Sequence, residues 1–219
     1  MVFSNFSGEI FNSEKKGTFN IKFAILPTII SFFLSLTLSM IAVQIYPNFN
    51  WVYNSFSHLG LYPKGAQSIY FFSGALIITF LGNIPLLICC IKQSIQNIDK
   101  LKFIGLIFLF ITDSTFGFEA LFPMIFYNLH LFGAQLLLIS LIISLLILII
   151  SNFKRKIEKN YKIIYLASLI LLLIIWPYYL YLNYLNPLVN YAIPELIDYT
   201  IFYVILATLF NYLIINKSK

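Results

Sequence analysis

The sequence predicts an all-α, polytopic membrane protein with six transmembrane helices, and three observations support that class. The 219 residues are 60% hydrophobic and only 10% charged, against about 25% charged residues in a typical soluble domain. Six apolar runs approach or exceed the roughly 20 residues that span a bilayer core. The basic residues lie in the connections between these runs and are not gathered on one face. The net charge of +6 therefore indicates membrane orientation and not a nucleic-acid partner.

The apolar runs divide the chain into a polar N-terminal tail (1–22), a six-helix transmembrane domain (23–215) and a basic C-terminal tail (216–219). The N-terminal tail has no apolar segment followed by a small-residue cleavage site, so we do not expect a cleavable signal. Pro47 follows the first run, Pro123 marks the turn after the third, and Pro194 opens the sixth at a first-turn position. The predicted helices are 23–45, 67–91, 101–122, 125–150, 163–184 and 194–215.

The distribution of Lys and Arg predicts the orientation of these helices. Thirteen of the fourteen basic residues lie in the two tails and in the connections after the second and fourth runs. Only Lys64 lies in the other connections. Because cytoplasmic loops carry the excess of Lys and Arg, we expect both termini in the cytoplasm and a multi-pass protein of the cell membrane.

Asp113 is the most unusual residue of the predicted membrane region. It lies about 16 Å beyond Lys102 along the third helix, whereas Glu119 lies about 25 Å beyond Lys102, near the far interface. A charged side chain at the bilayer centre costs roughly 2.5–3.5 kcal/mol on insertion scales. We therefore expect Asp113 to face the bundle interior, with Asn83 or Gln135 as its partner.

The predicted outer side collects both histidines and half of the acids, which makes it the candidate functional region. The residues concerned are His58, Asp113, Glu119, His130, Glu195 and Asp198. Imidazole and carboxylate groups are zinc ligands, and a metal-bound water could attack an ester or amide. No HExxH or paired-cysteine motif is present, so a metal would need ligands from separate helices. Glu195 and Asp198 also suit an ordinary helix N-terminus, and His130 could simply bond a neighbouring carbonyl.

The order of several short motifs resembles that of a known family. These motifs are Ser57-His-Leu-Gly60, a second helix bearing Gly74, Phe122-Pro123 followed by His130, and Glu195 opening the last helix. Over residues 23–215 they are similar to the domain of unknown function 998 (DUF998) family, prokaryotic six-helix membrane proteins without an established activity. The resemblance implies that Ser57, Gly60, Gly74, Pro123, His130 and Glu195 match the family pattern. It supports the architecture and leaves the chemistry open.

Three functional hypotheses follow. The leading one is an outer-side cavity that binds a lipid or small polar ligand through Ser57, Asp113, Glu119, His130 and Glu195, and it requires Ser57, His130 and Glu195 to meet. The second is a metal-assisted lipid hydrolase, with Asp113, His130 and Glu195 holding a divalent metal such as zinc and Glu119 as a base. The third is a transporter, although no internal repeat is evident. The ligand, catalysis and oligomeric state do not follow from the sequence.

Overall fold

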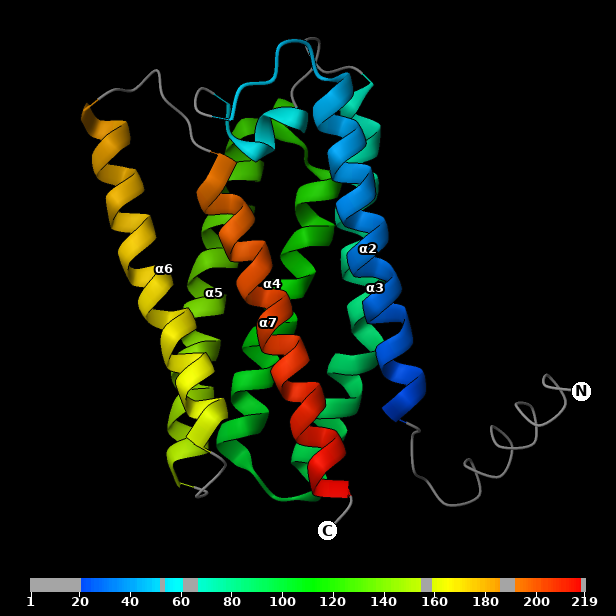
Figure 1. Cartoon of the computed structure of the whole chain (residues 1–219), viewed down its shortest axis with the longest axis vertical. Helices are drawn as coiled ribbons and strands as arrows, with labels where there is room; N and C mark the ends of the chain where they lie inside the picture. Colours follow the sequence, from blue (N-terminus) through cyan, green and yellow to red (C-terminus); the bar gives the residue numbers. More distant parts are fainter. Residues whose placement is uncertain (1–20, 52–53, 61–66, 155–158, 186–191, 218–219) are drawn as a thin grey trace, which may run out of the picture.

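The protein is an up-and-down bundle of α-helices (Figure 1). The computed structural model describes residues 21–51, 54–60, 67–154, 159–185 and 192–217, and these contain no β-strand. The helices are α2 (Ile21–Ile45), α3 (Ser68–Gln96), α4 (Lys100–Leu121), α5 (Tyr127–Lys154), α6 (Lys159–Leu185) and α7 (Ala192–Lys217). Two short 3-10 helices, η1 (Phe56–Gly60) and η2 (Met124–Phe126), lie together at one end of the bundle, which we call the η end. The predicted all-α class is confirmed.

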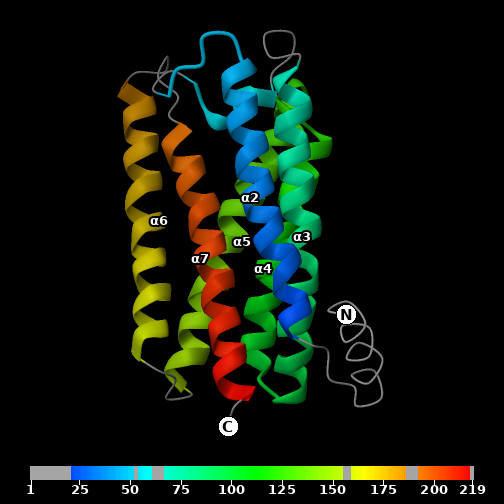
Figure 2. The same cartoon turned by 45° about the vertical axis from the view of Figure 1, so that its right-hand side comes forward.

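Within the described residues, five helices are long and apolar enough to cross a membrane. The five segments are Phe23–Ile45, Ser68–Gln96, Lys100–Leu121, Tyr127–Phe153 and Tyr161–Tyr178. The chain is therefore a multi-pass membrane protein. The sixth helix, α7, is 26 residues long and begins with two acids in its first two turns. It lies between α2 and α6 in the bundle (Figure 2), and its C-terminus lies at the end opposite η1.

Close contacts between small residues join α2 to α3. The Thr28 hydroxyl donates to the carbonyl oxygen of Gly82 at 3.1 Å, so the two backbones nearly touch. A Cβ at Gly82 would lie only 2.2 Å from the Cβ of Ser31. Ser31, Ser35 and Ser39 are all buried, and their four-residue spacing places them on one stripe of α2 where small side chains allow close helix packing.

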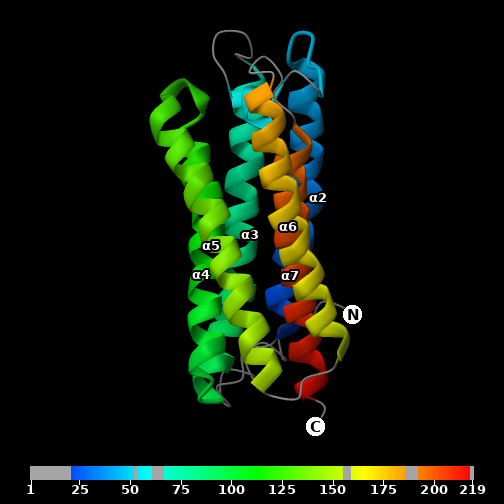
Figure 3. The same ribbon diagram turned by 90° about the vertical axis from the view of Figure 1, so that its left-hand side faces the viewer.

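Hydroxyl groups join α4 to α5 in the same way. Ser144 donates to the Gly105 carbonyl at 2.9 Å, and the hydroxyls of Thr112 and Ser140 lie 2.8 Å apart. Such contacts suit a membrane bundle because lipid supplies little hydrophobic drive for helices to associate. In Figure 3, α4 and α5 run side by side along one edge, with α6 and α7 on the other.

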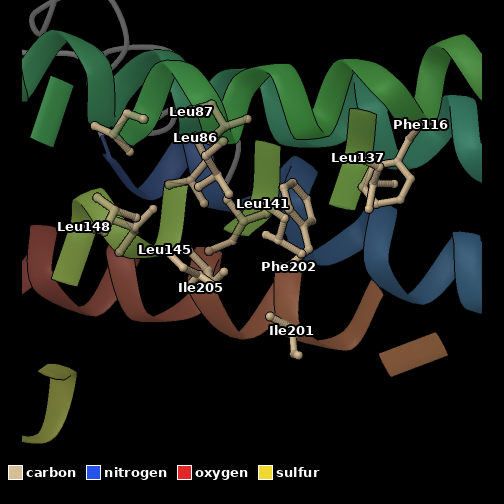
Figure 4. Packing of buried hydrophobic residues seen from close by; sticks show 14 of the residues in the cluster. Leu86, Leu87, Phe116, Leu137, Leu141, Leu145, Leu148, Ile201, Phe202 and Ile205 are labelled. Carbon is tan, nitrogen blue, oxygen red and sulfur yellow. The ribbon is translucent and has the colours of Figure 1, made fainter. Parts of the chain in front are cut away.

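A cluster of large apolar side chains fills the middle of the bundle. Figure 4 shows large side chains from four helices meeting there. They include Leu86, Leu87, Phe116, Leu141, Leu145, Leu148, Phe202 and Ile205.

A polar cavity at the η end as candidate site

A cavity of about 90 Å³ lies at the η end, enclosed by all six helices and η1. We call it the η-end cavity. The residues that line it are Ser39, Phe56, Ser57, Phe72, Ala75, Leu76, Thr79, Phe116, Glu119, Ala134, Leu137, Trp176, Glu195, Asp198 and Tyr199. Its lining residues come from η1 and from all six helices, so the cavity exists only in the folded protein. This makes it a better candidate site than any single sequence motif.

Glu195 fastens α7 to η1 at the rim of the cavity. Its Oε2 accepts hydrogen bonds from the backbone N–H of Ser57 at 2.7 Å and from the Ser57 hydroxyl at 3.2 Å. The η1 turn is itself held by Ser68, whose hydroxyl donates to the Leu59 carbonyl at 2.8 Å. At its far end Gly60 packs so closely that a Cβ there would lie 3.3 Å from the Cβ of Pro123. The resemblance had grouped Ser57 with Glu195, and the structure places them in contact.

Asp198 lies one turn further along α7 and is held from α6. Both of its carboxylate oxygens accept from the indole Nε1 of Trp176, at 2.9 and 3.1 Å. The carboxylate is buried, so this hydrogen bond offsets part of its desolvation. The pair also ties α6 to α7.

Tyr199 closes the cavity on the side of the apolar core. Its hydroxyl hydrogen-bonds the Ser35 hydroxyl of α2 and lies 2.8 Å from the Thr79 hydroxyl of α3. Its ring packs edge-on against Phe116 at 5.7 Å between centroids. One side chain therefore joins three helices below the polar space.

Glu119 differs from the other two acids of the cavity because the protein leaves part of its carboxylate unsatisfied. The side chain is 7% exposed, and its Oε1 is buried without a hydrogen-bond partner. Gly133 of α5 provides the room, since a Cβ there would lie 3.0 Å from the Cγ of Glu119. A buried acceptor without a partner costs about 1–3 kcal/mol, so this atom requires an explanation.

Asp113 faces the bundle interior, but it does not line the cavity. Its Oδ1 accepts from the amide nitrogen of Asn83 at 3.0 Å, as one of the two predicted pairings required. The other candidate partner, Gln135, is exposed. Asp113 Oδ2 and Asn83 Oδ1 are both buried without partners. A proton on Asp113 would supply the donor that this pair of acceptors lacks.

The two histidines form local hydrogen bonds near η1 and η2. His130 is buried, and its Nδ1 lies 3.1 Å from the Phe122 carbonyl oxygen. Because a carbonyl only accepts, Nδ1 carries the hydrogen. The Nδ1 of His58 accepts from the backbone N–H of Ser55 at 2.7 Å. Neither imidazole lines the cavity, so the structure brings Ser57 and Glu195 together without His130.

The three predicted metal ligands bond to separate partners. Asp113 pairs with Asn83, His130 with the Phe122 carbonyl, and Glu195 with Ser57. Across the described part of the chain, no three His, Cys, Asp or Glu side chains are grouped as metal ligands. Of the five predicted binding residues, Ser57, Glu119 and Glu195 line the cavity and Asp113 and His130 do not.

From the sequence, Asp198 was one of the acids of the predicted outer side but not one of the predicted binding residues, and Trp176 and Tyr199 were not predicted to belong to the site. The spacing of Glu195 and Asp198 contained a usable signal, since residues three apart lie on one face of a helix. Their helix-start position gave a simpler explanation, and that explanation hid their shared orientation. The partner Trp176 had no sequence signal, because its contact depends on how α6 packs on α7.

A comparison with known families agrees with the order of motifs noted in the sequence. A family model described as "Protein of unknown function (DUF998)" matches residues 29–211, which is most of the chain. The chain belongs to the DUF998 family. No curated protein and no solved structure matches it. In this DUF998 protein, the family-like residues Ser57, Gly60 and Glu195 build the rim of the η-end cavity and its support.

Proposed function

We propose that this DUF998 protein binds a small polar ligand, or the polar head group of a membrane lipid, in the η-end cavity. The observation that supports the proposal most strongly is that Glu119, whose Oε1 has no hydrogen-bond partner among the described residues, lines this cavity. The protein supplies donors to Glu195 and Asp198 and none to this atom. A bound ligand would satisfy it.

The geometry favours binding over hydrolysis. A metal-assisted hydrolase needs His130, Asp113 and Glu195 to converge on one ion, and these side chains are engaged at three separate places. The Ser57 hydroxyl donates its one hydrogen to the Glu195 carboxylate and so does not donate it to a histidine. The transporter hypothesis gains no specific support either, so we retain the binding role.

The distribution of charge supports an outer-side location for the cavity in the cell membrane. The η end is where the connection with the single base Lys64 begins and ends. The other thirteen Lys and Arg residues lie in or near the two tails and the connections after α3 and α5, and the described helix ends that border these segments lie at the opposite end of the bundle. By the positive-inside rule that end is cytoplasmic, and α7 would be the sixth span. A ligand would then reach the cavity from outside the cell or from the outer leaflet.

Native mass spectrometry of the purified protein tests the binding role. Ala75→Leu adds three carbon atoms to a wall of the cavity, and Ala167→Leu makes the same change on the exposed face of α6. We expect a bound small molecule or lipid in the parent and in Ala167→Leu, and its loss in Ala75→Leu. Retention of the same bound mass in a folded Ala75→Leu protein would contradict the proposal.

A further inference from the structure

The charge of the η-end cavity is one-sided. Glu119, Glu195 and Asp198 all line it, and none of the described residues that line it is Lys, Arg or His. Three carboxylates around one small space repel one another when ionised, and low polarity strengthens that repulsion. A bound cation would offset it. Glu119 lines this cavity, and its Oε1 is buried without a hydrogen-bond partner, so a ligand N–H that reaches this carboxylate would supply the missing donor.

The remaining walls of the cavity are largely aromatic. Phe56, Phe72, Phe116, Trp176 and Tyr199 line it, with Phe56 against Phe72 and Phe116 against Tyr199 at 5.5 and 5.7 Å between ring centroids. Aromatic faces attract cations, and such cages commonly recognise organic ammonium groups. A strongly hydrated inorganic ion gains little from these walls. The combination of acids and rings therefore favours an organic cation.

The size of the cavity limits the ligand further. A cavity needs at least about 10–15 Å³ to hold one buried water molecule. A cavity of about 90 Å³ therefore has room for a small chemical group and not for a whole phospholipid. An amine with a short carbon stem fits. A lipid could place only its head group there.

From these three features we propose that the η-end cavity binds an organic ammonium group, supplied by a free small amine or by an amine-bearing lipid head group. The inference deepens the proposed binding function and rests on it. Glu119 accepts directly from the ligand ammonium. Glu195 and Asp198 keep their bonds to Ser57 and Trp176 and contribute charge.

Trp176 provides a reporter inside the cavity. The chain has two tryptophans, Trp51 and Trp176, so Trp51→Phe leaves Trp176 alone. Trp51 is 37% exposed and packs on Phe49 outside the cavity, and phenylalanine keeps an aromatic contact there. Because the Trp176 indole donates to Asp198, a cation beside that carboxylate should change Trp176 fluorescence.

The first arm uses three small molecules of nearly equal size and different charge. Trp51→Phe protein in an uncharged detergent, at constant ionic strength, is titrated with ethanolamine, ethylene glycol and glycolate, and choline is added as a quaternary ammonium probe. The second arm uses nanodiscs of phosphatidylglycerol with and without phosphatidylethanolamine. Saturable change with a free amine indicates a soluble ligand, and change only with phosphatidylethanolamine indicates a lipid source. Either outcome supports the proposal.

Isosteric amide variants test the residues. Glu119→Gln should raise the half-saturating concentration of ethanolamine at least about tenfold, because a charge-assisted hydrogen bond is lost. Asp198→Asn keeps an oxygen that can accept from Trp176 and should also raise the half-saturating concentration of ethanolamine. This variant tests the proposal if Glu119→Gln fails to fold. Asp99→Asn is the matched control: it removes a buried carboxylate at the opposite end of the bundle, and asparagine is an equally good helix cap. Its amine response should equal that of the parent.

The proposal is overturned if no ammonium probe acts in either arm, if ethylene glycol or glycolate acts as strongly as ethanolamine, or if folded Glu119→Gln and Asp198→Asn respond like the parent. These failures are separable from failure of the binding role itself. An anionic or neutral molecule that is retained by the parent and lost from Ala75→Leu would overturn only the ammonium class. Absence of any bound molecule in the purified parent, together with no response to any probe in either arm, would overturn both.

Discussion

Gly82→Ala should destabilise the bundle although alanine is the better helix former. Gly82 lies on α3 where α2 crosses closest. A Cβ at this position would lie 2.2 Å from the Cβ and 2.3 Å from the hydroxyl oxygen of Ser31, and 3.0 Å from the Pro27 carbonyl oxygen. Because ordinary carbon contacts are about 3.5–4.0 Å, the two helices must separate locally by more than about 1 Å.

Two opposing terms set the size of this effect. Overpacking a well-packed interface costs typically about 1–3 kcal/mol, occasionally more. Replacing glycine by alanine within a helix returns up to about 1 kcal/mol. Separation of the helices would also stretch the 3.1 Å hydrogen bond from Thr28 to the Gly82 carbonyl. We therefore expect a net loss of about 1–2 kcal/mol or more.

Thermal unfolding followed by a thiol-reactive fluorophore measures this loss, since Cys89 and Cys90 are buried in the folded protein and are not joined in a disulfide. Gly74→Ala is the matched control on the same helix, because its Cβ would meet only Leu38 at 3.9 Å. Gly74→Ala should be neutral or stabilising, and Ser31→Gly should rescue Gly82→Ala by removing the clashing Cβ. Equal stability of Gly82→Ala and Gly74→Ala would refute the close α2–α3 packing.

Three further predictions address the buried polar groups and the orientation. Asp113→Leu should lower the free energy of unfolding by about 1–3 kcal/mol, because it leaves the buried Asn83 amide without its acceptor. Unchanged thermal stability would show that the hydrogen bond between Asn83 and Asp113 is not formed. Ser57→Ala should cost less than Glu195→Gly in the same assay, since the 2.7 Å backbone bond to the carboxylate remains; the reverse order would contradict the rim geometry. A cysteine at Asn48 should react with an impermeant reagent from outside intact cells, and a cysteine at Ile98 should not. Asn48 follows α2 at the η end, whereas Ile98 lies between α3 and α4 at the other end of the bundle. The opposite labelling pattern would show that the orientation is inverted.

The helices themselves were predictable because lipid imposes a simple rule on the backbone. Every spanning segment must satisfy its own hydrogen bonds and be apolar over about 20 residues, so runs such as 23–45 and 101–122 are visible without tertiary information. The same rule predicted an inward Asp113 and named Asn83 as a partner. The last apolar run, which follows Glu195 and Asp198, was predicted by the same rule, and the structure has it as the helix α7.

The site was harder to predict because depth along a helix says nothing about rotation around it. His130 and Glu195 both lie near the η end, yet His130 turns to the Phe122 carbonyl and Glu195 to η1. The bond between Trp176 and Asp198 depends on the packing of α6 against α7. Gly133, which makes room for Glu119, gave no sign of that role in the sequence.

The most direct test of ligand binding in the η-end cavity is an experimental structure of the protein in lipid nanodiscs, at a resolution that shows side chains and bound molecules. We expect density for a bound ligand in the η-end cavity, within hydrogen-bond distance of the Glu119 carboxylate. Ser57 should still bond to Glu195, and Trp176 to Asp198. A cavity filled by the protein's own side chains, or a Glu119 carboxylate paired with a Lys or Arg of this chain, would contradict it.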